Sequence, residues 1–427
     1  MKAYLFLITF FSLNCLNAVD LEICLATKQR NKTLYLANNQ YLKNEYQKKL
    51  VKIFTSALKF NQEFYFATNS NTSEFWAHHK DRSMALNQER WHLRGIEYLL
   101  IPKLNNDYYE VTLYNVCANQ SHEIHSEKLT HNIQIDRYTL LKLADKISQI
   151  LLHKPSVVSK KILFCRKGSL FTMTYDGKQI QKVETGHHDC TTPANIGESG
   201  QFIFTSFDQG QSKIIHLKEG QDSKPIIKLR GNQMLPAISK KTNCIAYICD
   251  AASRADLYIQ PFNAAIGAFK KPIQLFAKNG SVQSSPTFHP GGTKLVFVSD
   301  KSGQPDIYMI NLLKNKGNKC LPKATSFITK TKNNTSPAFS NCGKYLAYLS
   351  KINGTRQVWV FNFKTKESKQ ITFDVNNKES PCFSPCSQYI LYNTSSSDCN
   401  IFLIGLESKQ VIQLTNKGDC QYAVFID

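Results

Sequence analysis

Five prolines recur at a nearly constant interval through the C-terminal two-thirds of the chain, and each stands eleven residues before an aromatic residue. The clearest copies read S-P-T-F-H-P, S-P-A-F-S-N and S-P-C-F-S-P, from Ser285, Ser336 and Ser380. Successive prolines are 43, 50, 51 and 44 residues apart. A period of roughly 40–50 residues built from short strands is typical of a β-propeller, in which each repeat forms one blade. The five pairs are Pro193 and Phe204, Pro236 and Tyr247, Pro286 and Phe297, Pro337 and Tyr348, and Pro381 and Tyr392.

The repeat that begins at Pro286 predicts how one blade folds. Runs rich in β-forming residues are separated by clusters of Gly, Pro, Ser and Asp, which favour turns. Four strands per blade fit this pattern. The expected strands are Pro286–Phe288, Lys294–Ser299 and one that starts at Asp306, and fourth strands are expected at Gln370–Thr372 and Gln413–Thr415 of later repeats.

The number of blades follows from the two ends of the repeat region. Leu163-Phe164 and Leu170-Phe171 match the second and third strands of a blade that lacks its first strand. Gln421–Ile426 follows the last repeat by about one blade step and can supply that strand, which would hide strand edges that otherwise template aggregation. We therefore predict a six-bladed β-propeller over residues 156–427, closed by the C-terminal strand. Its repeated phenylalanines are expected in the core between blades rather than in a row that stacks ligands: Phe288, Phe339 and Phe383.

Residues 1–18 have the pattern of a signal peptide. Lys2 supplies a basic start, Ala3–Leu13 is apolar, and Leu16-Asn17-Ala18 offers a small residue for cleavage. Cleavage before Cys15, which would make a lipoprotein, is the alternative, but Leu-Asn-Cys matches that signal poorly. No later segment of the sequence is long and apolar enough to cross a bilayer. The sequence predicts an exported protein.

Residues 19–155 lack the repeat and are expected to form a separate α/β domain, so the fold class is α+β. Asn44 is a credible N-cap for a helix that runs to Phe60, and Arg137–Leu152 predicts a second helix. Pro155 marks the expected linker. Strands are expected at Thr33–Ala37, Phe64–Ala67, Gly95–Ile101 and Tyr108–Val116.

The formal net charge of +21 is large, but its lysines are scattered through nearly every turn. Nucleic-acid binding usually gathers positive charge on one face, so the pattern favours a solvated, lysine-rich surface. Attraction to acidic envelope surfaces or partners is the alternative. Twelve of the 13 cysteines remain if Cys15 leaves with the signal, and their pairing cannot be read from the sequence. Cys244 and Cys249 fall on opposite faces of one strand and should not bridge each other.

Catalytic signatures are weak, and no metal or other cofactor is predicted. A hydrolase of the α/β class needs a G-x-S-x-G elbow, which the sequence lacks. The densest cluster of possible metal ligands, His187-His188-Asp189-Cys190, falls between blades and is interpreted as a turn. A lyase or cyclase in the propeller funnel would need ionisable groups at the axis, whereas the first strands offer mainly Pro, Phe, Ser and Thr. We predict that the chain is not an enzyme.

The chain resembles the TolB family, the exported propeller proteins of the Tol-Pal cell-envelope system of Gram-negative bacteria. The resemblance covers essentially the whole chain after the signal, and its strongest part is an α/β domain joined in this order to six blades. Its degenerate turns, such as His289–Gly292, depart from the Ser-Pro-Asp-Gly of the family. The segments that carry it are Gly95–Leu99, Tyr109–Tyr114, Leu143–Ile147, Ser159–Phe164 and Pro286–Met309.

The resemblance implies a non-catalytic periplasmic adaptor, a monomer within a complex, that serves outer-membrane integrity and constriction at division. It implies that loops before the first-strand prolines, here at Asn232, Leu235 and Ser284, bind Pal, the peptidoglycan-associated lipoprotein. It also implies that an N-terminal strand pairs with the inner-membrane protein TolA; that strand corresponds to Asp20, Leu21, Glu22 and Ile23. Because Ala26-Thr27-Lys28 replaces the expected turn, TolA pairing stays open. The alternative function is an exported propeller that binds or processes a small ligand in its central funnel.

Overall fold

The computed structural model describes residues 31–37, 44–61, 63–67, 88–105, 107–154, 156–197, 200–276, 280–312, 325–326, 333–395 and 398–426. The predicted signal peptide, the segment Asp20–Ile23 and Pro155 lie outside these residues. The chain divides into two compact units, and the boundary lies between Leu143 and Ala144. The domain boundary predicted after residue 155 stays a prediction.

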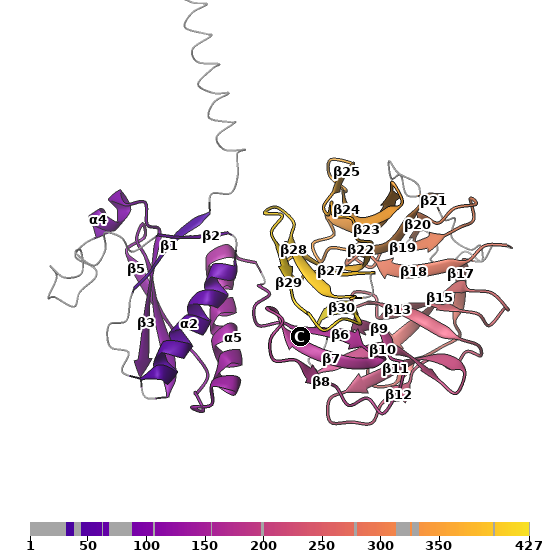
Figure 1. The fold of residues 1–427 in the computed structure, drawn as a ribbon, viewed down its shortest axis with the longest axis horizontal. Coiled ribbons are helices and arrows are strands. Elements are labelled where there is room, and N and C mark those ends of the chain that lie inside the picture. The colour runs from indigo at the N-terminus through magenta and orange to yellow at the C-terminus, as the bar shows by residue number, and fades with distance from the viewer. Residues whose placement is uncertain are drawn as a thin grey trace, which may run out of the picture. The chain divides into compact units, whose positions relative to one another are not determined.

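The N-terminal unit is a five-stranded sheet with its two long helices on one face (Figure 1). Its strand order is β2-β1-β3-β4-β5, with β1 parallel to β2 and β3 and the rest antiparallel. The Asn44 side chain caps the first long helix by accepting a hydrogen bond from the Gln47 backbone N–H, as predicted. The elements are β1 (Lys32–Leu36), α2 (Glu45–Phe60), β2 (Phe64–Phe66), α4 (Gln88–Leu93), β3 (Tyr98–Asn105), β4 (Tyr108–Asn115), β5 (Gln120–His125) and α5 (Ile133–Leu152).

Strand β5 was not predicted from the sequence. Its residues, QSHEIH, are exposed except for Ile124, so the strand lacks the alternation of apolar and polar residues that a half-buried strand shows. It forms by backbone pairing with β4, from Glu110 opposite His125 to Asn115 opposite Gln120. The short helix α4 was also not predicted.

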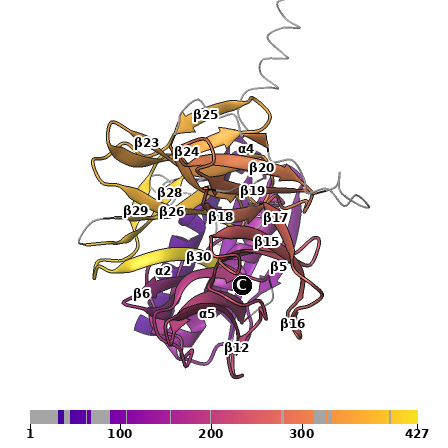
Figure 2. The ribbon, with the colours of Figure 1, turned by 90° about the vertical axis from the view of Figure 1, so that its right-hand side faces the viewer.

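The second unit is a β-propeller with six blades within the described residues, arranged around a common axis (Figure 1); Figure 2 views the ring from its edge, with β15, β17 and β18 facing the reader. Blade 1 contains β6 (Lys161–Arg166), β7 (Ser169–Thr174) and β8 (Gln181–Lys182), and blade 2 contains β9 (Thr191–Asn195), β10 (Gln201–Asp208), β11 (Gln211–Lys218) and β12 (Lys224–Pro225). Blade 3 contains β13 (Gln233–Ser239), β14 (Cys244–Cys249), β15 (Asp256–Asn263), β16 (Gly267–Ala268) and β17 (Ile273–Phe276). Blade 4 contains β18 (Gln283–Phe288), β19 (Lys294–Ser299), β20 (Asp306–Asn311) and β21 (Thr325–Ser326). Blade 5 contains β22 (Asn334–Phe339), β23 (Tyr345–Ile352), β24 (Thr355–Asn362) and β25 (Glu367–Gln370), and blade 6 contains β26 (Lys378–Phe383), β27 (Tyr389–Thr394), β28 (Ile401–Gly405) and β29 (Val411–Gln413).

The last strand, β30 (Cys420–Ile426), closes the ring. It pairs antiparallel with β6, from Cys420 opposite Arg166 to Ile426 opposite Lys161, and becomes the innermost strand of blade 1. The two ends of the propeller sequence therefore share one sheet, which confirms the predicted closure.

The core of the propeller lies between neighbouring blades. Phe288 packs with Ala246 and Ile248 of the preceding blade, and Phe339 packs with Val296 and Ile307 of the preceding blade. These phenylalanines are buried, as predicted. Two predicted fourth strands were placed about three residues too late, because β25 and β29 end at Gln370 and Gln413, where those predictions began.

Turns and loops alternate between two faces of the propeller. We call front face the one formed by the loops that enter each innermost strand and the turns that join second and third strands. Hydrogen bonds connect these two sets, for example from the Val282 N–H to Asp300 Oδ1 (2.7 Å) and from the Arg356 N–H to Asn377 Oδ1 (2.7 Å). The back face carries the turns between first and second strands, where the Cys342 N–H donates to Ser387 Oγ of the next blade (3.1 Å).

Every cysteine in the described part of the chain is a free thiol. Cys244 and Cys249 both lie on β14 and do not bridge, as expected. Among the described residues, no helix is both long and apolar enough to span a membrane.

Candidate binding surface at the axial channel

The innermost strands of all six blades are interrupted by a β-bulge at the same place. In blade 4, Ser284 pairs with Val298 and Thr287 pairs with Val296, so one extra residue stands on the inner strand. The same shift occurs in β9, β13, β22, β26 and β30. Proline cannot donate to a strand ladder, which explains why five of the bulges contain the repeat proline.

Each bulge holds a residue other than glycine at positive φ. The φ angles are 44° at Thr192, 54° at Leu235, 47° at Ser285, 48° at Ser336, 49° at Ser380 and 54° at Tyr422. Such conformations are uncommon for these residue types, and they persist where the surrounding fold fixes them. Six of them in one ring indicate a surface whose shape is set by closure of the propeller.

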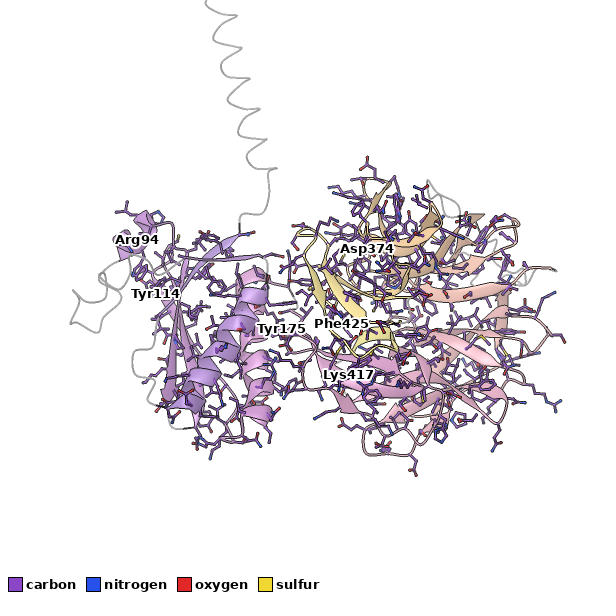
Figure 3. The ribbon with its side chains drawn as sticks, viewed as in Figure 1. Arg94, Tyr114, Tyr175, Asp374, Lys417 and Phe425 are labelled. Atoms are coloured by element: carbon purple, nitrogen blue, oxygen red, sulfur yellow. The ribbon has the colours of Figure 1, made fainter. Side chains whose placement is uncertain are left out.

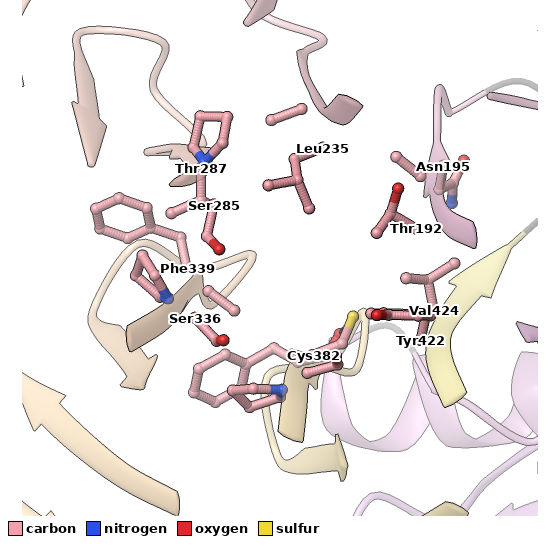
Figure 4. Close-up of a pocket in the computed structure, with 18 of the residues that line it drawn as sticks. Thr192, Asn195, Leu235, Ser285, Thr287, Ser336, Phe339, Cys382, Tyr422 and Val424 are labelled. Carbon is pink, nitrogen blue, oxygen red and sulfur yellow. Dashed lines mark hydrogen bonds between the residues drawn. The ribbon is translucent and has the colours of Figure 1, made fainter. Parts of the chain in front are cut away.

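The bulges line an axial cavity of about 590 Å³ (Figure 4). Hydroxyl groups of serine and threonine and the rings of the repeat prolines contribute much of its wall. The hydroxyl-bearing residues include Thr192, Ser285, Thr287, Thr335, Ser336 and Ser380. This wall offers hydrogen bonds and apolar contact, and it also contains the cationic side chain of Lys240.

Among the residues that line the cavity, the one carboxylate is neutralised by an arginine. Arg356 Nη2 donates to Glu379 Oε1 at 3.0 Å, and both side chains are partly exposed. The one acidic side chain of the wall therefore already has a cationic partner within the same wall. The arrangement offers a surface for binding.

The sequence-predicted site residues take different roles in this surface. Leu235 occupies the positive-φ position of its bulge and lines the cavity. Asn232 holds the front-face loop: its Nδ2 donates to Asp250 Oδ2 (2.8 Å), and its Oδ1 accepts from the Ser212 N–H (2.9 Å). Ser284 stands one residue before Ser285, which lines the cavity, and the two Oγ atoms are 3.0 Å apart. Whether these residues contact a partner stays a prediction, and Asp20, Leu21, Glu22 and Ile23 lie outside the described residues.

Sequence reasoning missed Arg356 and Glu379 as part of the channel. A signal existed, because Glu379 stands two residues before Pro381, where the neighbouring repeats carry Ser284 and Thr335. A charged residue at a repeat position that is otherwise held by uncharged side chains would have indicated a special contact. Arg356 comes from a different strand, β24, and only the ring geometry brings it to Glu379.

The His187 cluster lies in the loop between β8 and β9, as interpreted. His187 Nδ1 is 2.6 Å from Asp208 Oδ2, and its Nε2 is 2.9 Å from Ser223 Oγ. This chain of contacts has the order of a catalytic triad, but the Ser223 hydroxyl donates to the Thr185 carbonyl (3.0 Å). The serine must then accept from the imidazole, so the contacts hold the loop rather than activate a nucleophile. The described residues contain no group of three His, Cys, Asp or Glu side chains that could hold a metal ion.

An N-terminal α/β unit followed by six blades around a hydroxyl-lined channel defines a two-domain class of propeller protein. Comparison with known proteins gives the family within that class. The family described as TolB beta propeller domain matches residues 154–333. The protein TolB homolog of Protochlamydia amoebophila (strain UWE25) is 30% identical over 351 residues, which cover 78% of this chain and 75% of that protein. The chain belongs to the TolB family.

One further relative and one solved structure are similar to the chain. The protein TolB homolog of Chlamydia trachomatis serovar L2 is 31% identical over 271 residues, which cover 60% of this chain and 62% of that protein. The crystal structure of TolB from Acinetobacter baumannii matches with a TM-score of 0.69 at 17% identity and covers 94% of this chain and 98% of that one. At this identity the structural match establishes the fold alone.

Proposed function

We propose that the chain is a non-catalytic periplasmic adaptor of the Tol-Pal system, whose front face and channel mouth bind a Pal-like peptidoglycan-associated lipoprotein. Family membership implies a component of that system and a protein that binds rather than catalyses. The observation that carries the proposal is the ring of six bulges, which presents a fixed surface whose one lining carboxylate is paired. Through such binding the chain would serve outer-membrane integrity and constriction at division.

A TolA-like inner-membrane protein is the second proposed partner. The proposal rests on the alternating segment Asp20, Leu21, Glu22 and Ile23, which can add a strand to an exposed sheet edge. Backbone hydrogen bonds supply much of the affinity in that mode, so the residue types that follow the segment matter less.

The test measures binding of the full mature chain to the purified periplasmic domain of the Pal-like lipoprotein of the same organism. Leu235→Asn introduces a residue type that tolerates the positive φ of this position and removes the apolar side chain from the channel wall. We expect its affinity to fall at least about tenfold, as for a contact near the centre of an interface. Ile266→Asn, on the back-face loop between β15 and β16, is the control. No binding by the unaltered chain would reject the proposal.

A small ligand in the funnel is the second candidate function. The cavity of about 590 Å³ lies within the size range of small-molecule sites, roughly 300–1,000 Å³. A ligand there would contact Arg356, so Arg356→Gln would abolish binding of that ligand. Under this second function, the ligand would bind whether or not the lipoprotein is bound at the front face.

A further inference from the structure

The position three residues before each bulge proline is buried in every blade. It holds Gln233, Gln283, Asn334 and Lys378, and the corresponding residues of blades 2 and 1 are Cys190 and Cys420. Several of these side chains donate to carbonyls of the loop just before them. Gln233 Nε2 donates to the Leu229 carbonyl (2.5 Å), and Cys420 Sγ donates to the Gly418 carbonyl (3.1 Å). The position therefore ties the front-face loop to the inner strand.

Lys378 is the charged residue at this position, and its side chain is only 1% exposed. Its ammonium group donates to the Asp374 carboxylate and to the Asn376 carbonyl (2.9 Å). It also lies 5.8 Å from the centre of the Tyr392 ring. A buried ammonium is costly unless it is paired and hydrogen-bonded, so this loop is held by an unusually demanding interaction.

Further hydrogen bonds fix the same loop. Gln357 Nε2 donates to the Asp374 carbonyl (2.6 Å), and the Asn376 N–H donates to Asp374 Oδ1 (3.0 Å). Asn377 accepts from the Arg356 N–H through its side chain and from the Ser395 N–H through its carbonyl. The backbone between residues 373 and 377 is thus determined from several sides. Asp374 is labelled in Figure 3.

This rigid loop nevertheless presents two large apolar side chains to water. Phe373 is 74% exposed and Val375 is 89% exposed. Single exposed apolar residues are ordinary, but here two stand within three residues on a backbone held in place by the ion pair between Asp374 and the buried Lys378. Fixing apolar side chains before binding lowers the entropy cost of association.

The surroundings indicate the kind of partner. The loop leads directly into β26, whose Glu379 and Ser380 line the channel mouth, so it continues the proposed front-face surface. Lys351 is exposed and lies opposite Arg356 in the register of the β23–β24 hairpin, and the Arg356 backbone N–H donates to Asn377 Oδ1. Because Glu379 already neutralises Arg356, the positive charge offered on this side of the front face is that of Lys351. An apolar pocket rimmed by carboxylates would complement these features.

We propose that Phe373 and Val375 form an apolar anchor that inserts into a pocket with an acidic rim on the Pal-like lipoprotein, and that Lys378 positions this anchor. The proposal rests on the proposed function and deepens it, because it names the residues that would dominate the affinity. Aromatic anchors in rigid surroundings are typical of residues that carry much of the binding energy at an interface.

The experiment compares the full mature chain with Phe373→Ser/Val375→Ser in binding to the purified periplasmic domain of the lipoprotein. We expect the double variant to bind at least about tenfold more weakly, which corresponds to about 1.4 kcal/mol. Its melting temperature should stay unchanged, because both side chains are exposed in the free protein. Ile266→Ser is the matched control: Ile266 is 69% exposed but lies on a back-face loop, and its variant should bind within about twofold of the unaltered chain.

The outcomes separate the two proposals. Tight binding by the unaltered chain with an equal affinity for the double variant overturns the anchor but leaves the adaptor function standing. No binding by the unaltered chain overturns both. Vesicles with anionic lipid form a second arm: if the loop instead bound these vesicles and the double variant lost only that binding, the protein partner would be rejected as its occupant.

Discussion

The Asp374–Lys378 ion pair should respond very differently to removal of each partner. The Lys378 side chain is 1% exposed, whereas that of Asp374 is 52% exposed. Asp374→Ala leaves a buried ammonium with the Asn376 carbonyl as its remaining acceptor. Lys378→Met leaves a carboxylate that water can reach, and the Asn376 carbonyl keeps Gln357 Nε2 at 3.2 Å. We therefore expect the aspartate variant to be the less stable one.

The magnitudes follow from the burial of the two groups. Leaving one member of a buried pair without its partner costs about 3–5 kcal/mol in the free energy of unfolding. We expect a loss of about 3 kcal/mol for Asp374→Ala and about 1 kcal/mol for Lys378→Met.

Urea unfolding of the full chain, followed through the propeller transition, measures both losses. Asp374→Ala/Lys378→Met should be more stable than Asp374→Ala alone, because it removes the buried charge. Equal losses in the two single variants, or no recovery of stability in the double variant, would refute this reasoning.

Two further predictions concern closure and pH. Gly177 has φ +75°, and a Cβ there would lie 2.2 Å from the Leu414 carbonyl oxygen of blade 6, whereas Gly354 has φ +85° with open space around it. Thermal melts should show that Gly177→Ala loses more stability than Gly354→Ala, for which only the roughly 1–2 kcal/mol of backbone strain is expected. Equal losses would argue against the contact between the first and last blades. Partial burial acts to raise the pKa of Asp208, but hydrogen bonds from His187 and Ser206 outweigh it and hold that pKa below its usual range. The stability that Asp208 contributes is present above its unfolded pKa of about 4 and is lost as pH falls through the lower folded pKa. In melts below about pH 4, Asp208→Asn should therefore lose less stability with falling pH than the unaltered chain does, whereas Asp189→Asn, at an exposed position, should behave like the unaltered chain. Identical acid profiles for the unaltered chain and both variants would contradict this role of Asp208.

The propeller was predictable from the sequence because each repeat carries residues that mark where its strands begin. The proline and the aromatic residue eleven positions later mark the first and second strands, and those aromatics are buried in every repeat that carries the proline. Closure was also predictable, since one blade lacked a first strand at the start of the repeats and a strand remained at the end. The outer strands were harder: β25 is polar and partly exposed, and the buried Ile371, which drew the prediction, comes just after it.

The binding surface was less predictable because its features depend on register and on contacts between blades. A Ser-Pro pair indicates the start of a strand, but the bulge and its positive φ become apparent only once the partner residues are known. Lys378 illustrates the limit clearly. A lysine at the start of a strand is ordinarily solvated, and only the ring places it beneath its own loop with 1% exposure.

The bulges, and the buried side chains that tie the front-face loops to the inner strands, follow from one constraint. A ring of blades fixes the inner strands on both sides, so backbone conformations that an isolated hairpin would relax can persist at the axis. The buried side chains three residues before the bulge prolines then transmit that rigidity to the front-face loops, which are otherwise the parts of such a fold most free to move. A surface made in this way binds with little loss of conformational entropy, and its affinity depends on side chains that contribute nothing to the stability of the free protein. Phe373 and Val375 meet that description, because they are exposed on a loop that the fold holds in place at considerable cost.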